Sequence, residues 1–189
     1  FLLLCEDTSL LLPTIVSRCR SIKLHPWSDE VVLKALEKAG TPAEHRAEAA
    51  HLSGGSIGQA LEMAADTAFW QRREEVMRDF FALTSRTPIL SVSNRWKDRK
   101  DQAEELLRDV EEMLRTLYLA HIGMLDAKHI AGYPEAWQRL TREADDAVFA
   151  RLLDAVFEAR RRRMNQVTWQ AVIEGLLLHM TEEVQPWRR

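Results

Sequence analysis

The sequence predicts a mainly α-helical protein of 189 residues that begins with a short segment of mixed strand and helix. Three observations support this prediction. From Ser28 onward, apolar residues recur at intervals of three and four, which is the spacing of one helix face. Seven glycines and six prolines are too few for an all-β protein with many turns. Only before residue 28 are the apolar residues arranged in short runs and alternations.

The first 24 residues predict two strands on either side of a short helix. Residues 1–4 are a continuous apolar run, which favours a buried strand. Residues 10–17 suit a short helix, and residues 20–24 alternate so that Ile22 and Leu24 share one face, as in a strand. Because a protein rarely begins inside a core strand, we expect the sequence to be the C-terminal part of a longer one.

Residues 28–67 predict three short helices joined by tight turns. Ser28 is a candidate N-cap for the first helix, followed by two acidic residues that suit the positive helix end. Residues 41–44, Thr-Pro-Ala-Glu, have the pattern of a capping box with proline at the first helical position. Ser56 and Gln59 form a second such pattern. We therefore expect a small three-helix bundle.

Longer helices are predicted from about residue 68 to the end of the chain. Their apolar residues keep the spacing of an amphipathic helix, and glycine or proline separates several of them. The last five residues are expected to fray. The predicted helices are residues 69–83, 89–96, 101–122, 135–141, 145–164 and 167–181.

Composition and charge exclude several classes of function. Apolar residues make up 46% and charged residues 29%, and the net charge of −3 creates no overall attraction to nucleic acid. No apolar run approaches the roughly 20 residues of a membrane span, so we expect no membrane partner. Two cysteines are too few for a disulfide framework or a four-thiolate zinc site, which favours a cytoplasmic protein without a bound metal.

No catalytic motif stands out from the residues alone. A phosphate loop and a nucleophile elbow are both missing from the sequence. Residues 54–56, Gly-Gly-Ser, lack the lysine of a phosphate loop and the strand that should precede it. Residues 160–163 are four arginines that spread around a helix, so we interpret them as a solvated surface. A contact between these arginines and nucleic acid is the alternative.

One stretch carries a specific motif. Leu12, Pro13, Ser17, Arg18 and Cys19 match, in order and spacing, a Leu-Pro-x-x-x-Ser-Arg-Cys motif. With the residues around it, this stretch resembles the end of the ATPase core in bacterial clamp-loader subunits of the AAA+ superfamily. The resemblance implies that Arg18 is an arginine finger, which reaches ATP bound on the adjacent subunit. A guanidinium suits this role because it is planar and permanently charged.

A second stretch resembles the lid of the same family, with one difference. Residues 55–61, Gly-Ser-Ile-Gly-Gln-Ala-Leu, are similar to the lid segment Gly-Ser-x-Arg-x-Ala-Leu. In members that hydrolyse ATP, the arginine of this segment contacts the nucleotide of its own subunit. Here Gly58 stands at that position and has no side chain to reach a phosphate. The resemblance therefore implies a subunit that does not hydrolyse ATP itself.

A third stretch resembles the last helix of the family's collar, the domain through which subunits assemble. Asn165 and the run Leu176, Leu177 and Leu178 carry this weaker match. Consecutive residues point in three directions around a helix, so at least one of these leucines should face a partner subunit. The resemblance divides the chain into the end of an α/β AAA+ core (1–24), a three-helix lid (25–67) and a helical collar (68–189).

The combination of Arg18 and Gly58 is typical of the delta-prime type of subunit in the DNA polymerase III clamp loader. The implied partners are the tau/gamma and delta subunits, ATP on a neighbouring subunit and, through the complex, the sliding clamp and primed DNA. The fragment itself is expected to hold no cofactor and not to be catalytic, although it would belong to the DNA polymerase III holoenzyme, a nucleotidyltransferase complex. The alternatives are a catalytic tau/gamma-type subunit and an all-helical DNA-binding module.

Overall fold

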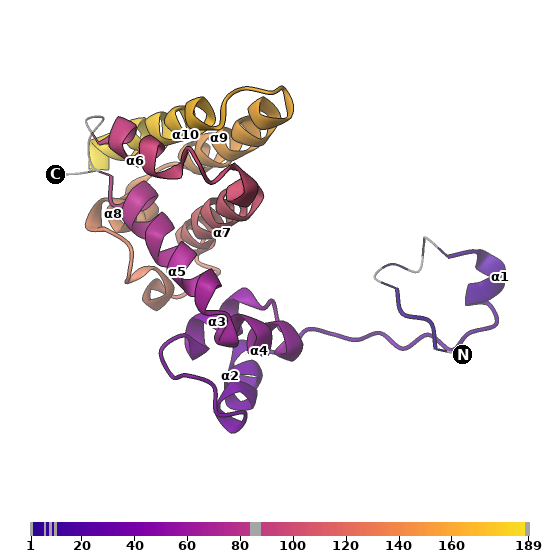
Figure 1. Cartoon of the computed structure of the whole chain (residues 1–189). Helices are drawn as coiled ribbons and strands as arrows, with labels where there is room; N and C mark the ends of the chain where they lie inside the picture. The colour runs from indigo at the N-terminus through magenta and orange to yellow at the C-terminus, as the bar shows by residue number, and fades with distance from the viewer. Residues whose placement is uncertain (1, 6, 8, 10, 84–87, 188–189) are drawn as a thin grey trace. The chain divides into compact units, whose positions relative to one another are not determined.

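The computed structural model describes residues 2–5, 7, 9, 11–83 and 88–187 (Figure 1). These residues form helices, turns and irregular segments, and they include no strand. The chain divides into two compact units, Phe1–Ala65 and Asp66–Arg189. Within the described residues, no helix has the length and apolar character that crossing a membrane requires.

Neither predicted strand forms among the residues that the structure describes. Residues 2–5 and 20–28 are irregular, and α1 (Pro13–Val16) lies between them. Leu4 is 84% exposed and Leu24 is 86% exposed. A strand needs a neighbouring strand to bind its backbone groups and cover its apolar face, and the described part of the chain offers none. The predictions for Phe1 and Leu10 fall outside the described residues.

The three predicted short helices are present in the first unit. They are α2 (Asp29–Lys38), α3 (Arg46–Leu52) and α4 (Ile57–Ala65), and each contacts the other two. Most of their buried side chains are small, which lets short helices approach closely. The buried apolar residues are Val32, Leu36, Ala49, Ala50, Ala60 and Ala64.

The capping box predicted for residues 41–44 is wrong. The helix begins at Arg46, four residues after Pro42, the predicted first helical position. Thr41 instead closes the preceding helix, because its Oγ1 donates a hydrogen bond to the carbonyl oxygen of Leu36 at 3.0 Å. The Nε of Arg46 then donates to the carbonyl oxygen of Thr41 at 2.7 Å. Thr41 thus ends α2 and does not cap α3.

The second unit is built on three longer helices. Helix α9 packs against both α7 and α10, and α6 covers another side of α10. The helix predicted for residues 69–83 is not a single α-helix. Helix α5 ends at Val76, and a π-helical turn, η2 (Met77–Phe81), follows it directly. The helices are α5 (Thr67–Val76), α6 (Ile89–Trp96), α7 (Ala103–His121), α8 (Glu135–Glu143), α9 (Asp146–Met164) and α10 (Trp169–Val184).

Short 3₁₀ turns complete this unit. They are η3 (Lys100–Gln102) before α7, η4 (Ala127–Ile130) in the connection to α8, and η5 (Gln185–Trp187) after α10. The predicted fraying of the last five residues is wrong for Gln185–Trp187, because Trp187 packs against the core. Residues 188 and 189 lie outside the described residues.

Aromatic residues fill much of the core of the second unit. Trp96 and Trp137 are both 1% exposed, and their ring nitrogens nevertheless have partners. The Nε1 of Trp137 donates to the carbonyl oxygen of Phe81 at 2.8 Å, and the Nε1 of Trp169 donates to that of Trp96 at 2.9 Å. Buried indoles satisfied in this way fix the positions of distant segments relative to one another.

Candidate arginine-finger site

The candidate site is the turn that follows α1. Pro13 occupies the first position of this helix, where its missing N–H costs no hydrogen bond. The Oγ of Ser17 donates to the carbonyl oxygen of Thr14 at 3.2 Å, and the backbone N–H of Arg18 donates to that of Ile15 at 3.0 Å. These local bonds hold the backbone of the turn, so the Arg18 side chain is not needed to stabilise it.

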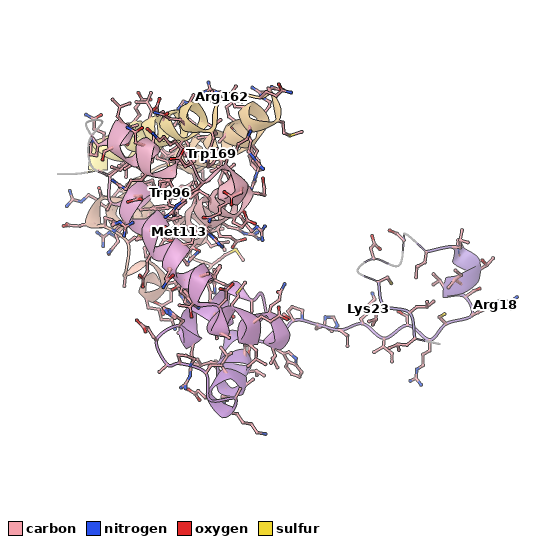
Figure 2. The ribbon with its side chains drawn as sticks, in the orientation of Figure 1. Arg18, Lys23, Trp96, Met113, Arg162 and Trp169 are labelled. Atoms are coloured by element: carbon pink, nitrogen blue, oxygen red, sulfur yellow. The ribbon has the colours of Figure 1, made fainter. Side chains whose placement is uncertain are left out.

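The guanidinium of Arg18 is exposed and makes no ion pair with any residue that the structure describes (Figure 2). Residues 8–28 contain Arg18, Arg20 and Lys23 but no aspartate or glutamate. The segment therefore has a local excess of positive charge, and all three cations are exposed. An anion from outside the segment is the natural partner for such a group.

The other residues of the motif surround Arg18 without covering it. Leu12 is 66% exposed, and Pro13, Ser17 and Cys19 are also exposed. Both Cys19 and Cys5 are free thiols. The structure thus places Leu12 and Pro13 at the start of α1 and Ser17, Arg18 and Cys19 in the turn after it, and the apolar side chain of Leu12 has no cover among the described residues.

A contact that the sequence did not predict anchors this segment to the three-helix bundle. The backbone N–H of Trp27 donates to the carbonyl oxygen of Gly55 at 3.0 Å. Gly55 has φ +85°, and a Cβ there would lie 2.5 Å from the Cβ of Pro26 and from the carbonyl oxygen of Trp27. Only glycine fits this close approach. In the sequence, the pair Gly54-Gly55 is the one feature that could have predicted this contact. The pair by itself predicts only a turn, and it does not predict which segment packs against that turn.

Gly58 is the second residue of α4 and is exposed. A Cβ built on it would meet nothing within 4 Å. The surroundings of this position therefore leave room for a larger side chain, including an arginine. Steric exclusion does not explain why glycine stands at this position.

The residues predicted for the collar interface differ in their accessibility. Leu176 is 2% exposed and Leu177 is 0% exposed, so both belong to the core of their own unit. Leu178 is 36% exposed, and Asn165, at the C-terminal end of α9, is also exposed. Helix α10 is nearly surrounded by its neighbours, which leaves Leu178 as the leucine of this run that can contact a partner.

The four consecutive arginines of residues 160–163 each contact a carboxylate of the same chain. Arg160 and Arg163 donate to Glu104 of α7, at 3.2 Å and 2.8 Å. The other two pair with Glu158 on their own helix. The interpretation of these arginines as a solvated helix surface holds for Arg161 and Arg162, which are exposed, whereas Arg160 and Arg163 are partly buried and tie α9 to α7.

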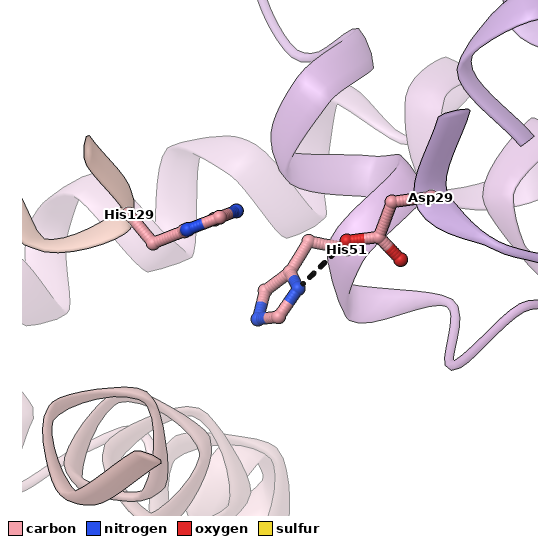
Figure 3. Close-up of side chains that lie close together, drawn as sticks. All are labelled: Asp29, His51 and His129. Atoms are coloured by element: carbon pink, nitrogen blue, oxygen red, sulfur yellow. Dashed lines mark hydrogen bonds and ion pairs between the residues drawn. The ribbon is translucent and has the colours of Figure 1, made fainter. Parts of the chain in front are cut away.

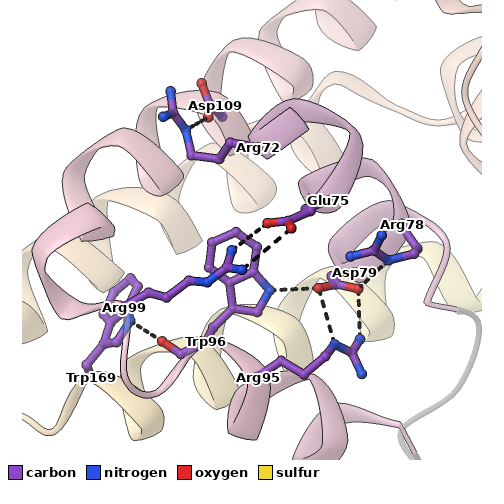
Figure 4. A network of polar contacts seen from close by, with 9 residues as sticks. All are labelled: Arg72, Glu75, Arg78, Asp79, Arg95, Trp96, Arg99, Asp109 and Trp169. Carbon is purple, nitrogen blue, oxygen red and sulfur yellow. Dashed lines mark hydrogen bonds and ion pairs between the residues drawn. The ribbon is translucent and has the colours of Figure 1, made fainter. Parts of the chain in front are cut away.

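A buried carboxylate organises the polar contacts beside the π-helical turn (Figure 4). Asp79 accepts hydrogen bonds from Arg95 at 2.7 Å, Trp96 at 2.8 Å and Arg78 at 3.1 Å. Burial by itself would raise the pKa of Asp79, but the bonds from Arg95, Trp96 and Arg78 outweigh burial and lower this pKa. The ionised carboxylate joins η2 to α6. Arg99, which binds Glu75, lies over the Trp96 ring at 4.6 Å.

A second buried carboxylate joins α5 to α7. Asp109 accepts a hydrogen bond from the Nε of Arg72 at 2.6 Å (Figure 4). Burial raises the pKa of Asp109, and the attraction of Arg72 lowers it by less. Asp79 and Asp109 therefore have pKa values shifted in opposite directions, although each contacts an arginine.

Within the first unit, Asp29 and His51 form a contact between α2 and α3 (Figure 3). The Nδ1 of His51 lies 3.1 Å from the Oδ2 of Asp29. The histidine is in the last turn of α3 and the aspartate in the first turn of α2, which places both where the helix dipoles favour their charges. One aspartate and one histidine are fewer ligands than the three that a catalytic zinc keeps, so we interpret the pair as a structural contact.

Comparison with known protein families, curated proteins and solved structures finds no match for this chain.

Proposed function

We propose that the chain is part of a delta-prime type subunit of the bacterial DNA polymerase III clamp loader, a member of the AAA+ superfamily. In this proposal, residues 1–24 end the ATPase core, residues 25–67 form the lid and residues 68–189 form the collar. Arg18 reaches ATP on a neighbouring tau/gamma subunit, and the assembled cytoplasmic complex, which includes delta, loads the sliding clamp onto primed DNA. The subunit itself does not hydrolyse ATP.

The proposal rests on one observation: the backbone of Arg18 is held in place while its guanidinium is exposed. Its backbone is held by the hydrogen bonds of the α1 turn, and its guanidinium is exposed without an ion pair among the described residues. An arginine finger needs both properties, because it must be positioned by its own subunit and remain free for a phosphate. In the neighbouring site, Arg18 would stabilise the charge that develops on the γ-phosphate.

Gly58 supports the non-hydrolysing type of subunit over the catalytic tau/gamma type. The position has room for an arginine, yet the residue there has no side chain to contact a nucleotide. A complete phosphate loop, Gly-x-x-x-x-Gly-Lys-Ser/Thr, in the protein that contains this chain would instead favour the tau/gamma alternative.

The test compares Arg18→Ala with Arg20→Ala in the full subunit, reconstituted with the other clamp-loader subunits. Arginine fingers contribute about 10³- to 10⁵-fold in rate in other phosphoryl-transfer systems. We expect Arg18→Ala to lower DNA-stimulated ATP hydrolysis by a factor of this order at the site that Arg18 serves, with assembly intact by native mass spectrometry. Arg20→Ala removes an equally exposed arginine from the same segment and should change the rate little. Unchanged hydrolysis in an intact Arg18→Ala complex would contradict the proposal.

An all-helical DNA-binding module is the alternative from another class. Its candidate surface was the run of residues 160–163, but these arginines already pair with Glu104 and Glu158. A DNA-binding surface would give tight binding that weakens steeply with salt. Titration of the chain with duplex and primed DNA at two salt concentrations tests this alternative, and we expect weak binding at both.

A further inference from the structure

Helix α9 carries apolar side chains on two opposite sides. One side packs against α7 and α10, and there α9 contributes Phe149, Leu152 and Val156 to the core of the second unit. On the other side, Phe157 is 53% exposed and Met164 is 83% exposed. A surface helix usually carries polar residues opposite its core face, so the local fold does not account for these two side chains.

The exposed side of α9 has the spacing of a coiled-coil seam. Its residues recur at alternating intervals of three and four, which keeps them in one line along the helix. Four of them are apolar, and the other two are an aspartate and an arginine of opposite charge. We call this set the α9 stripe; its members, all exposed, are Ala147, Ala150, Asp154, Phe157, Arg161 and Met164.

The surface is hollowed beside Phe157. A hollow of about 250 Å³ is lined by Asp154, Phe157, Glu158 and Arg161. A cavity of about 150 Å³ is enough to bind benzene in another protein, so this hollow has room for the ring of a second phenylalanine. Glu158 brings no uncompensated charge to the hollow, because it pairs with Arg161 and Arg162.

The two charges of the α9 stripe make it complementary to itself in one orientation. Asp154 lies three residues before Phe157, and Arg161 lies four residues after it. If two copies of α9 pack antiparallel with their Phe157 rings together, Asp154 of each copy lies opposite Arg161 of the other. A two-fold axis produces this pair twice. Parallel packing would instead place like charges opposite each other, which disfavours it.

Both charged side chains are available for such a contact. The structure gives Asp154 no ion pair with any residue that it describes. The side chain of Arg161 is 73% exposed, and its pair with Glu158 is an exposed contact within one helix, which contributes little free energy. Arg161 can therefore add a contact across an interface without an appreciable loss.

We propose that the α9 stripe binds a second copy of this chain, with the two α9 helices antiparallel and Phe157 of each copy beside the two-fold axis. One pair of helix faces buries less than the roughly 1,200 Å² of a standard interface, so we expect a weak dimer with a Kd of about 10 to 100 μM. The proposal depends on the surface of α9 alone and not on the clamp-loader proposal.

Sedimentation velocity of the full chain measures its association. Across concentrations from about 1 to about 500 μM, we expect a shift from monomer to dimer that Phe157→Ala weakens about tenfold or more. Leu90→Ala is the matched control, because Leu90 is 63% exposed on α6 and should leave the dimer unchanged. A chain that stays monomeric over this range would overturn the proposal, and so would equal effects of the two substitutions.

Charge reversal tests the antiparallel orientation. Asp154→Lys and Arg161→Glu each place like charges opposite each other twice in the dimer, so we expect each to raise the Kd about tenfold. The double variant restores opposite charges across the interface and should recover most of the affinity. Both positions are exposed, and circular dichroism checks that every variant folds.

The pattern across the three variants decides between the possible occupants of the stripe. Loss in both single variants with recovery in the double variant supports the proposal. A dimer that none of the charge variants changes would overturn it, because self-association would then use another surface. The proposal would also fail if the stripe were protected from hydrogen exchange only when a different protein binds, since the occupant would then not be a second copy.

Discussion

Several arginines of the second unit differ from Arg18 in what surrounds their guanidinium groups. Arg72, Arg95, Arg151 and Arg160 each form an ion pair with a carboxylate from another helix or turn. Arg18 lies in a segment, residues 8–28, that contains no acidic residue at all. The same side chain thus joins elements of the fold in one region and remains available to an external anion in the other.

This comparison shows how the position of acidic residues decides what an arginine can do. A guanidinium next to a carboxylate of its own chain has already exchanged water for that partner. A guanidinium without such a partner keeps its hydration and can exchange it for a phosphate. Three predictions test this contrast, beginning with the substitution expected to change stability most.

The largest effect is expected for Asp79→Asn. The substitution removes the charge shared by Arg78 and Arg95 and weakens the acceptor of the buried Trp96 nitrogen. Breaking such a buried contact costs about 3 kcal/mol of unfolding free energy. Urea denaturation measures this loss, and Asp154→Asn, an exposed aspartate on α9, is the matched control with little expected effect.

If Asp79→Asn and Asp154→Asn were equally stable, the contacts of Asp79 would not stabilise the fold. The contrast between arginines that join helices and an arginine left free would then lose its energetic basis, even though the geometry remained.

The two buried aspartates should respond to acid in opposite ways. The pKa of Asp79 is lowered, so its stabilising contribution is present above the ordinary value of 3.8 and is lost as the pH falls through its folded pKa. The pKa of Asp109 is raised, so the folded state binds its proton more readily than the unfolded state does. Its contribution therefore falls as the pH rises from 3.8 through its folded pKa.

Thermal unfolding of Asp79→Asn and Asp109→Asn between pH 3 and pH 7 checks these signs. A folded-state pKa that differs from the unfolded-state pKa by one changes the free energy of unfolding by about 1.4 kcal/mol. Relative to the wild type, Asp79→Asn should lose less stability on acidification, and Asp109→Asn should lose more. The same direction of change in both variants would contradict the opposite shifts.

The smallest effect on stability is expected for Arg18→Ala. The side chain is exposed and has no ion pair within the described residues, so the free energy of unfolding should change by less than about 0.5 kcal/mol. Arg160→Ala is the paired measurement, because it removes contacts with Glu104 and Glu111 of α7 and should cost about 1 kcal/mol. A clear loss of stability in Arg18→Ala would show that this arginine serves its own chain.

Local patterns in the sequence were sufficient to predict most of the helices. The helix predicted for residues 89–96 has the bounds of α6, Ile89–Trp96. Amphipathic spacing is a local property, and each helix satisfies its backbone hydrogen bonds within itself. The π-helical turn η2 was not predicted, because the spacing of its apolar residues fits an α-helix equally well. For the candidate site, the sequence supplied the motif around Arg18, while the hydrogen bond between Trp27 and Gly55 was found only in the structure.

The helical character of the chain, the absence of acidic residues around Arg18 and the glycine at position 58 are all properties of the sequence alone. Which leucines of residues 176–178 are buried, and which carboxylates the arginines bind, depend on how the helices pack. Arg160 and Glu104 are 56 positions apart, and Trp169 and Trp96 are 73 positions apart. Contacts over such separations depend on how the helices pack. A strand likewise depends on a neighbouring strand to bind its backbone groups, and for this reason the two predicted strands do not form among the described residues.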